Sequence, residues 1–300
     1  MIITNNKSNK HAIPSFVTGG LTLPPLAAES IFHIGSFAVT NTYINTVLTV
    51  IGFAVFAFFI KRAAERYYSG NEAPKGLLNF FEKILEILFK YFDQATGNRK
   101  QTVKFVPIVG SLFFFILVSN WIGLLPGIGS FGVYQLHHGV VELTPIFRSA
   151  NTDLNLTLAM AVFAVIVSHI VGIATIGFFK YANKFIKLGD LWKALATLNP
   201  MKILVAIIEL FVGFIEIFSE IAKFISLSLR LFGNVFAGEV LLTVLGSLIA
   251  FVVPLPFMAL ELLVGIVQAT VFSMLTLVYL TIATTEIHGH AEPEPALAEH

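Results

Sequence analysis

Apolar segments long enough to cross a bilayer recur along this chain, and they constrain its fold more than any other feature. A helix needs about 20 consecutive apolar residues to span the hydrocarbon core, and residues 41–60 and 103–125 each supply such a run. Hydrophobic residues make up 56% of the 300-residue chain and charged residues 12%, against about 25% charged residues in soluble domains. The sequence therefore predicts an all-α, polytopic membrane protein.

What the sequence lacks excludes several classes of function. It contains no Cys, which excludes structural disulfides and thiolate metal sites. It contains no internal repeat and no GxxxxGK[ST] nucleotide-binding loop, so this chain is not expected to hydrolyse nucleotide itself. No metal, other cofactor or nucleic acid is expected to bind. The first residues lack the basic-then-apolar order of a cleaved signal peptide, so they are treated as part of the mature protein.

The order of apolar and polar segments predicts about five membrane-embedded helices and one helix in the interface. Residues 1–40 are expected to form an external N-terminal segment, and residues 41–300 a single membrane domain. The first three spans are predicted at 41–60, 103–125 and 153–179. Residues 76–92 carry apolar side chains on one side and charged ones on the other, typical of a helix lying in the interface. A polar loop is expected over 126–152, followed by Asp153 as a helix cap.

The distribution of Lys and Arg predicts the orientation of these spans. Segment 61–104 holds nine such residues and segment 180–202 holds five, whereas the N-terminal tail holds two and the 126–152 loop holds one. Because cytoplasmic loops carry the excess of positive charge, the first two segments are expected inside and the other two outside.

The last third of the chain predicts a long helical hairpin. Residues 203–253 contain no Pro, and one helix over this length would measure about 75 Å, whereas the hydrocarbon core is only about 30 Å thick. The helix must therefore be steeply inclined, or its first part must lie near the cytoplasmic surface. Two prolines in "VVPLPF" break it, and a second helix is expected over 257–287. The turn then faces outside and the C-terminus is cytoplasmic.

Ionisable residues accumulate in this apolar hairpin. Each charge at mid-bilayer costs about 2.5–3.5 kcal/mol on insertion scales, so an ion or substrate path is the default interpretation. The residues concerned are Glu209, Glu216, Glu220, Lys223, Arg230, Glu239 and Glu261. Four of them recur every seven positions, from Glu209 to Arg230, and form one polar stripe. Glu239 comes nine residues after Arg230, which places it on the opposite side of the helix.

Depth separates the same residues. The acids at the start of the helix are expected near the cytoplasm, and Glu239 and Glu261 flank the outer turn. The pattern predicts two offset polar half-paths with Arg230 between them, which would not short-circuit the membrane potential. A simpler interpretation is kept for Glu220 and Lys223, which could form an ion pair on a partly solvated surface. His169 is interpreted as a hydrogen-bonded packing residue.

Four motifs then resemble one known family. They are "SLSLRLFGNVFAGE" (226–239), "QATVFSMLTLVYL" (268–280), "SNWIGLLPG" (119–127) and "TDLNLTLAMA" (152–161). Together they resemble the a subunits of F-type ATP synthases, the stator proteins of the F0 sector that lie beside the rotating c-ring. The resemblance covers most of the chain.

The resemblance implies roles for particular positions. Arg230 matches the essential arginine of the family, which faces the c-ring carboxylate and prevents protons from leaking between the half-channels. Polar positions associated with the proton path are matched by Asn234, Glu239 and Gln268, and those of the cytoplasmic half by Glu216 and Ser219. Glu261 falls where some members have His, so both outer positions are acidic here. Some relatives have Asp where this chain has Gly123, so no role carries over to that position.

The expected function follows from this resemblance. The chain would form the two half-channels that load and unload the c-ring carboxylate, and would couple proton flow to ATP synthesis without being an enzyme on its own. Its partners would be the c-ring, the subunit b peripheral stalk and, indirectly, the F1 sector. The bacterial plasma membrane is the expected location. The alternative, a secondary transporter with an intramembrane charged site, predicts repeated half-structures, which the first three spans do not provide.

Overall fold

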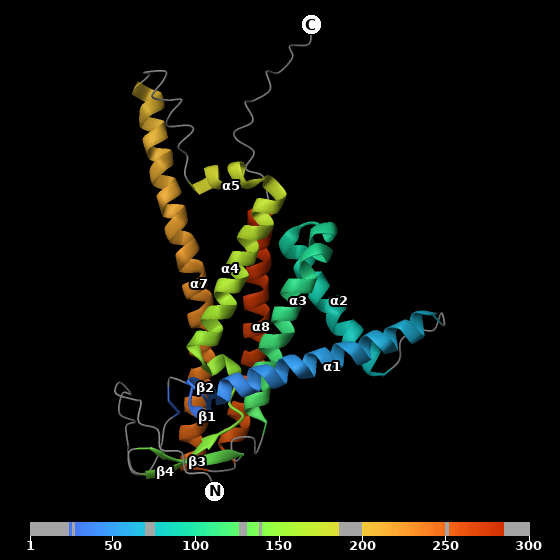
Figure 1. The fold of residues 1–300 in the computed structure, drawn as a ribbon. Helices are drawn as coiled ribbons and strands as arrows, with labels where there is room; N and C mark the ends of the chain where they lie inside the picture. Colours follow the sequence, from blue (N-terminus) through green and yellow to red (C-terminus); the bar gives the residue numbers. More distant parts are fainter. Residues whose placement is uncertain are drawn as a thin grey trace.

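The computed structural model describes residues 24–25, 28–69, 76–125, 131–137, 140–185, 200–249 and 252–284. Most of these residues are helical, which confirms the predicted all-α fold class (Figure 1). Most of the expected external N-terminal segment and the C-terminal tail after residue 284 lie outside the described residues.

Four helices pack lengthwise and form the core. They are α3 (Arg99–Leu124), α4 (Leu154–Ile176), α7 (Pro200–Leu248) and α8 (Pro254–Thr284). Fully buried Ile116, Ala161, Ala269 and Leu277 belong to one cluster that joins these helices. The small side chains in that cluster allow close approach of the backbones, which is the usual way in which membrane helices associate.

Length and composition identify the candidate membrane spans. Within the described residues, four helices are long and apolar enough to cross a membrane: Asn41–Tyr67, Arg99–Leu124, Leu154–Ile176 and Pro254–Thr284. The first belongs to α1 (Asn41–Ser69), which crosses the other helices instead of running beside them (Figure 1). The four candidate spans therefore cannot all run parallel to the membrane normal.

The long hairpin helix has the length that the sequence analysis expected. Helix α7 has 49 residues, about 74 Å at 1.5 Å per residue, and its first half stands clear of α4 and α8 in Figure 1. It ends at Leu248, and α8 begins at Pro254. A helix more than twice as long as the hydrocarbon thickness must be inclined if it lies within the membrane.

Tight backbone features end the shorter helices. The amphipathic α2 (Leu77–Thr96) stops at Gly97, whose φ of 65° is in the left-handed region. Helix α4 stops before Gly177, with φ of 95°, and the chain continues as the short α5 (Phe178–Phe185). The expected cap is confirmed, because the Asp153 side chain accepts a hydrogen bond from the Asn155 amide at 2.9 Å.

Two antiparallel β-hairpins lie near the α7–α8 end of the molecule, and the sequence analysis did not predict them. The first pairs β1 (Ser30–Ile34) with β2 (Phe37–Thr40), and the second pairs β3 (Gly132–His137) with β4 (Val140–Pro145) (Figure 1). The second falls in the segment interpreted as a polar loop. Strands of four to six residues give too short a period-two pattern to be separated from apolar neighbours.

The segment after β4, which contains Ser149, is hydrogen-bonded to α3. Ser149 Oγ donates to the carbonyl of Ser119 in α3 at 3.0 Å. A Cβ at Gly123 would lie 2.8 Å from Ser149 Cβ and 3.3 Å from its backbone, so any larger side chain must displace this segment.

Substituting Gly123→Ala should therefore lower the thermal unfolding temperature of the detergent-solubilised protein. Overpacking against a backbone costs about 1–3 kcal/mol. Gly110→Ala in the same helix is the matched control, since its Cβ would meet only Val106 Cγ1 at 3.8 Å, and Ala favours a helix over Gly by about 1 kcal/mol. Equal unfolding temperatures for the two variants would contradict the tight contact.

Candidate ion path

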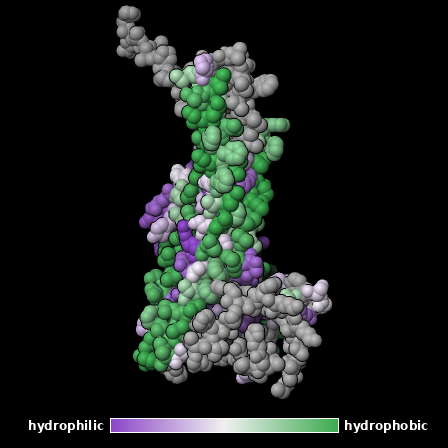
Figure 2. All heavy atoms as spheres, turned by 90° about the vertical axis from the view of Figure 1, so that its left-hand side faces the viewer, coloured by the Kyte–Doolittle hydropathy of each residue, from purple (hydrophilic) through white to green (hydrophobic). Residues whose placement is uncertain are grey.

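Arg230 lies on the exposed side of α7. Leu229, the preceding residue, is 52% exposed, and Ile225, five residues before Arg230, is 42% exposed. Figure 2 shows this face of the molecule as largely hydrophobic, with hydrophilic patches about midway along it. Within the described residues, no carboxylate forms an ion pair with Arg230. The guanidinium is thus presented outward from an apolar face, without a counter-charge from this part of the chain.

The two polar residues predicted beside Arg230 differ in exposure. Asn234, one turn further along α7, is exposed. Gln268 is only 7% exposed, within α8, which packs against α7. Asn234 therefore belongs to the outward face of Arg230, whereas Gln268 is buried among the packed helices.

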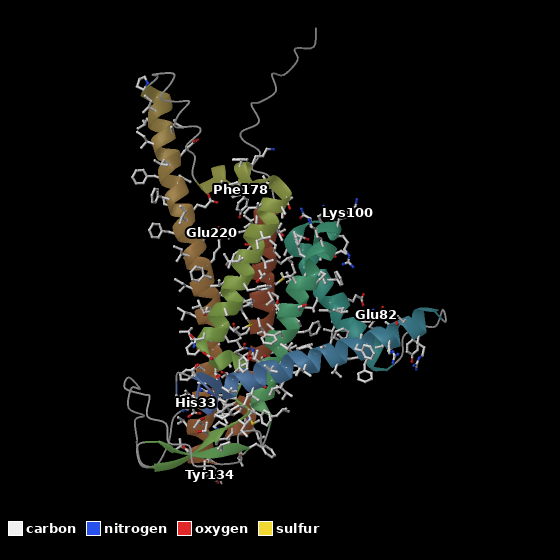
Figure 3. All side chains as sticks on the ribbon, viewed as in Figure 1. His33, Glu82, Lys100, Tyr134, Phe178 and Glu220 are labelled. Atoms are coloured by element: carbon white, nitrogen blue, oxygen red, sulfur yellow. The ribbon has the colours of Figure 1, made fainter. Side chains whose placement is uncertain are left out.

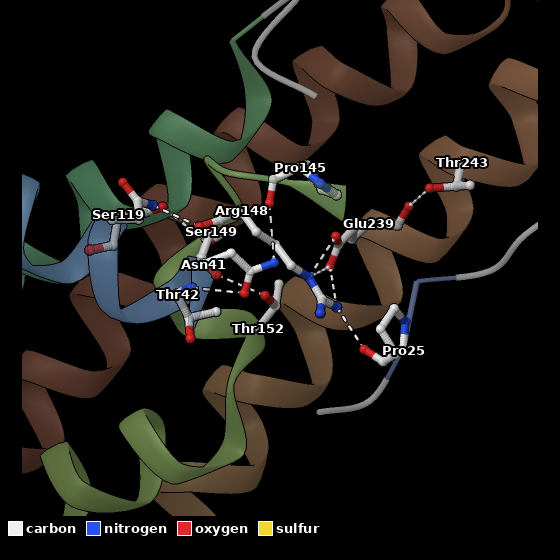
Figure 4. Close-up of polar contacts among 11 residues, drawn as sticks. Pro25, Asn41, Thr42, Ser119, Pro145, Arg148, Ser149, Thr152, Glu239 and Thr243 are labelled. Carbon is white, nitrogen blue, oxygen red and sulfur yellow. Dashed lines mark hydrogen bonds and ion pairs between the residues drawn. The ribbon is translucent and has the colours of Figure 1, made fainter. Parts of the chain in front are cut away.

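Glu239 points into the protein and meets a cation that the sequence analysis missed. Arg148 Nε donates to both Glu239 oxygens, at 2.9 and 3.1 Å, and Arg148 Nη2 donates to Oε2 at 2.9 Å (Figure 4). The Arg148 side chain is 2% exposed and the Glu239 side chain 27%. The sequence did carry a signal, because Arg148 is the only Lys or Arg of the 126–152 loop and this loop was expected on the same side as Glu239.

Several segments fix the position of Arg148. Its Nη2 also donates to the carbonyl of Pro25 at 2.9 Å, and its own carbonyl accepts from Asn45 Nδ2 of α1 at 2.8 Å. Three residues before Arg148, the carbonyl of Pro145 accepts a hydrogen bond from Asn41 Nδ2 at 3.3 Å (Figure 4). The Arg148–Glu239 ion pair therefore joins helix α7 to the N-terminal part of the chain.

Glu261 lies against the same turn of α7. A Cβ added at Gly238 would collide with the Glu261 carboxyl group, so the carboxyl fills the space that this glycine leaves open. Glu261 is partly buried. The structure thus brings together Glu239 and Glu261 near the α7–α8 turn, as two acids in different surroundings.

A second polar cluster lies between α7, α4 and α5, nearer the N-terminal end of α7. Lys223 Nζ lies 2.5 Å from Glu220 Oε1, so the expected pairing is present. Glu220 faces α4 (Figure 3), where its Oε2 lies 3.6 Å from His169 Nε2. His169 Nδ1 is joined to the Tyr181 hydroxyl by a hydrogen bond of 2.7 Å, which agrees with the hydrogen-bonded role expected for His169.

Burial and nearby negative charges raise the pKa of the Tyr181 phenol in this cluster. Burial, with the negative charges of Glu220 and Glu216 adding to it, raises the pKa of Tyr181 to about 12. The phenol therefore remains protonated and able to donate a hydrogen bond at neutral pH. Glu216 is partly buried one turn before Glu220, whereas Ser219 is exposed.

The two clusters flank Arg230 at separate positions. Glu220 precedes Arg230 by ten residues and Glu239 follows it by nine, about 15 Å and 14 Å along the helix axis. Arg230 and Glu239 also occupy opposite sides of α7, the first exposed and the second turned to Arg148. Among the described residues, no group of three or more His, Cys, Asp or Glu side chains could hold a metal ion.

Known proteins are similar in sequence to most of this chain. Residues 43–281 match the family model of the ATP synthase A chain. The chain is 33% identical over 216 residues to ATP synthase subunit a of Syntrophobacter fumaroxidans, covering 72% of this chain and 74% of that relative. It is 29% identical over 260 residues to the Moorella thermoacetica subunit, covering 87% and 96% respectively. With most of its length matched, and with Arg230 and both acid clusters inside the matched region, the chain belongs to the ATP synthase A chain family.

Proposed function

We propose that this chain is the proton-translocating a subunit of the F0 sector of an F-type ATP synthase, and that it forms two offset half-channels beside a ring of c subunits. The exposed position of Arg230 on an apolar face carries the proposal. A permanent cation is costly in such surroundings unless it meets an anion or water. A carboxylate supplied by a partner would provide that anion.

The outer half-path leads to this partner carboxylate. A proton enters from outside near Glu261 and Glu239 and neutralises the carboxylate on the c-ring. The neutral site can then rotate through lipid, because an uncharged carboxyl group is far less costly to place there than an ionised one.

The inner half-path receives the proton at the end of the rotation. When the loaded site meets Arg230, the cation favours the ionised carboxylate, and the proton leaves toward Glu216 and the cytoplasm. Arginine suits this role because it remains charged at any working pH. The neighbouring Glu220, Lys223 and His169 supply polar surroundings on this side.

The offset between the clusters prevents a direct leak. A proton moving straight through would dissipate about 2.3 kcal/mol per 100 mV. The two clusters are about 29 Å apart along α7, and the outer one lies on the side opposite Arg230. A proton can therefore pass between them only on a rotating carrier.

The setting of the subunit follows from the same proposal. The chain is not an enzyme on its own, and it works within a complex that holds the c-ring, the subunit b peripheral stalk and, indirectly, the F1 sector. The bacterial plasma membrane is its location, with the N-terminus outside and the C-terminus in the cytoplasm, as the distribution of Lys and Arg indicates.

Replacing Arg230 by Ala should abolish ATP-driven proton pumping. The reason is that no fixed cation would then discharge the carrier or separate the half-paths. The measurement is the fluorescence quench of a pH-sensitive dye in inverted membrane vesicles containing the assembled complex. Leu229→Ala, at the exposed residue before Arg230, is the matched control and should pump normally. Robust coupled pumping by the Arg230→Ala variant would rule out the assignment.

Glu261→Gln should reduce passive proton uptake through F0 by at least about tenfold, because an amide cannot take up and release the proton. Vesicles stripped of F1 and energised by a potassium diffusion potential provide the measurement. Glu65→Gln is the control, since this carboxylate is exposed on α1, outside both acid clusters. Unchanged uptake in the Glu261→Gln vesicles would contradict the outer half-path.

Co-purification separates this function from a secondary transporter. In mild detergent, the tagged chain should bring down a c-ring and peripheral-stalk proteins. Recovery of the chain alone, together with substrate-driven transport, would favour the transporter instead.

A further inference from the structure

Arg148 and Glu239 form a closed ion pair inside the protein. Three hydrogen bonds of 2.9–3.1 Å engage both oxygens of the carboxylate, and the guanidinium is almost completely removed from solvent. Bidentate pairs of this kind are stronger and more exact in geometry than single charge-assisted bonds. Both acceptor atoms of Glu239 are therefore already in use in the resting protein.

A proton on Glu239 would break this arrangement. The added O–H would present a donor to a guanidinium that offers only donors. The buried Arg148 would also lose its counter-charge, and breaking one side of a buried pair is strongly unfavourable. The geometry therefore opposes the use of Glu239 as a carrier that is protonated in each cycle.

Glu261 has no such restriction. In the part of the chain that the structure describes, its carboxyl group has neither a hydrogen bond nor an ion pair. It lies against Gly238, in the turn of α7 that carries Glu239. A proton can join the Glu261 carboxylate without breaking a bond, and its transfer to the partner carboxylate returns Glu261 to the anion.

The contacts of Arg148 hold the pair in one place. Pro25, Asn45 and the Ser149–Ser119 hydrogen bond fix the segment from three directions. The cation is consequently anchored to the N-terminal part of the chain, and α7 is fixed relative to it through Glu239. Any shift of Arg148 would move or free the Glu239 carboxylate.

We propose that Arg148 is a positioning residue of the outer half-path: it holds Glu239 as a permanently ionised, immobile anion, and Glu261 alone carries the entering proton. The inference rests on the proposed function and divides its outer half-path into a fixed charge and a carrier. Because its charge is balanced by Arg148, Glu239 does not compete with Glu261 for the entering proton.

The test uses passive proton uptake by F1-stripped vesicles that contain the full F0 complex. Arg148→Gln leaves a partly buried carboxylate without its cation, and Glu239→Gln leaves a buried cation without its anion, so each single variant should lose at least about tenfold in rate. The double variant R148Q/E239Q restores a neutral, hydrogen-bonded pair. Its rate should recover to within about threefold of the unmodified protein, because Glu261 is intact.

Two further variants separate a fixed charge from a simple structural link. Arg148→Lys keeps the positive charge and should retain more uptake than Arg148→Gln. Glu261→Gln should remain inactive in the R148Q/E239Q background. Immunoblots of the purified complex establish that each variant assembles.

Two results would overturn the proposal. A double variant as inactive as Glu239→Gln, in a complex that assembles normally, would show that Glu239 carries the proton. Loss of assembly in both Arg148→Lys and the double variant would show that Arg148 serves only as a structural link. Failure of the proposed function is distinguishable, because the unmodified vesicles would then take up no protons at all.

Discussion

Removing a charge from water is costly, and this constraint explains how the charged side chains of the apolar helices are arranged. The chain satisfies it in two ways. Glu239 and Arg148 neutralise each other inside the protein through three hydrogen bonds, as Glu220 and Lys223 do in the second cluster. Arg230 is left on an exposed, apolar face. The difference between paired and outward charges separates the groups that hold the structure from the group that would meet a partner in the proposed function.

The geometry of helix α7 places these charged groups on different sides. Successive residues of α7 rotate by about 100°, so the nine residues from Arg230 to Glu239 carry the chain from its exposed face to its inner face. The two acid clusters are consequently separated both along the helix and around it. A straight path along one face of α7 would therefore not connect them, as the proposed function requires.

Much of the fold could be read from the sequence because hydrophobic length is a strong signal in membrane proteins. The all-α class, the long hairpin and the Asp153 cap follow from local pattern, and the structure agrees with them. The two β-hairpins could not be read in this way, since their strands are too short to give a clear period-two pattern. The crossing direction of α1 was equally hidden, because composition gives the length of a helix but not its angle to its neighbours.

The sequence by itself determined which residues are chemically unusual: a cation and several acids in segments otherwise made of apolar side chains. Helical periodicity also determined that Arg230 and Glu239 lie on opposite sides, because that relation depends only on local geometry. Apart from the local Glu220–Lys223 pair, only the tertiary structure decided which charges are neutralised. Arg148 and Glu239 are 91 residues apart, and His169 and Glu220 lie on different helices. Such pairs form when the packing of helices and loops brings distant segments together, which no local pattern specifies.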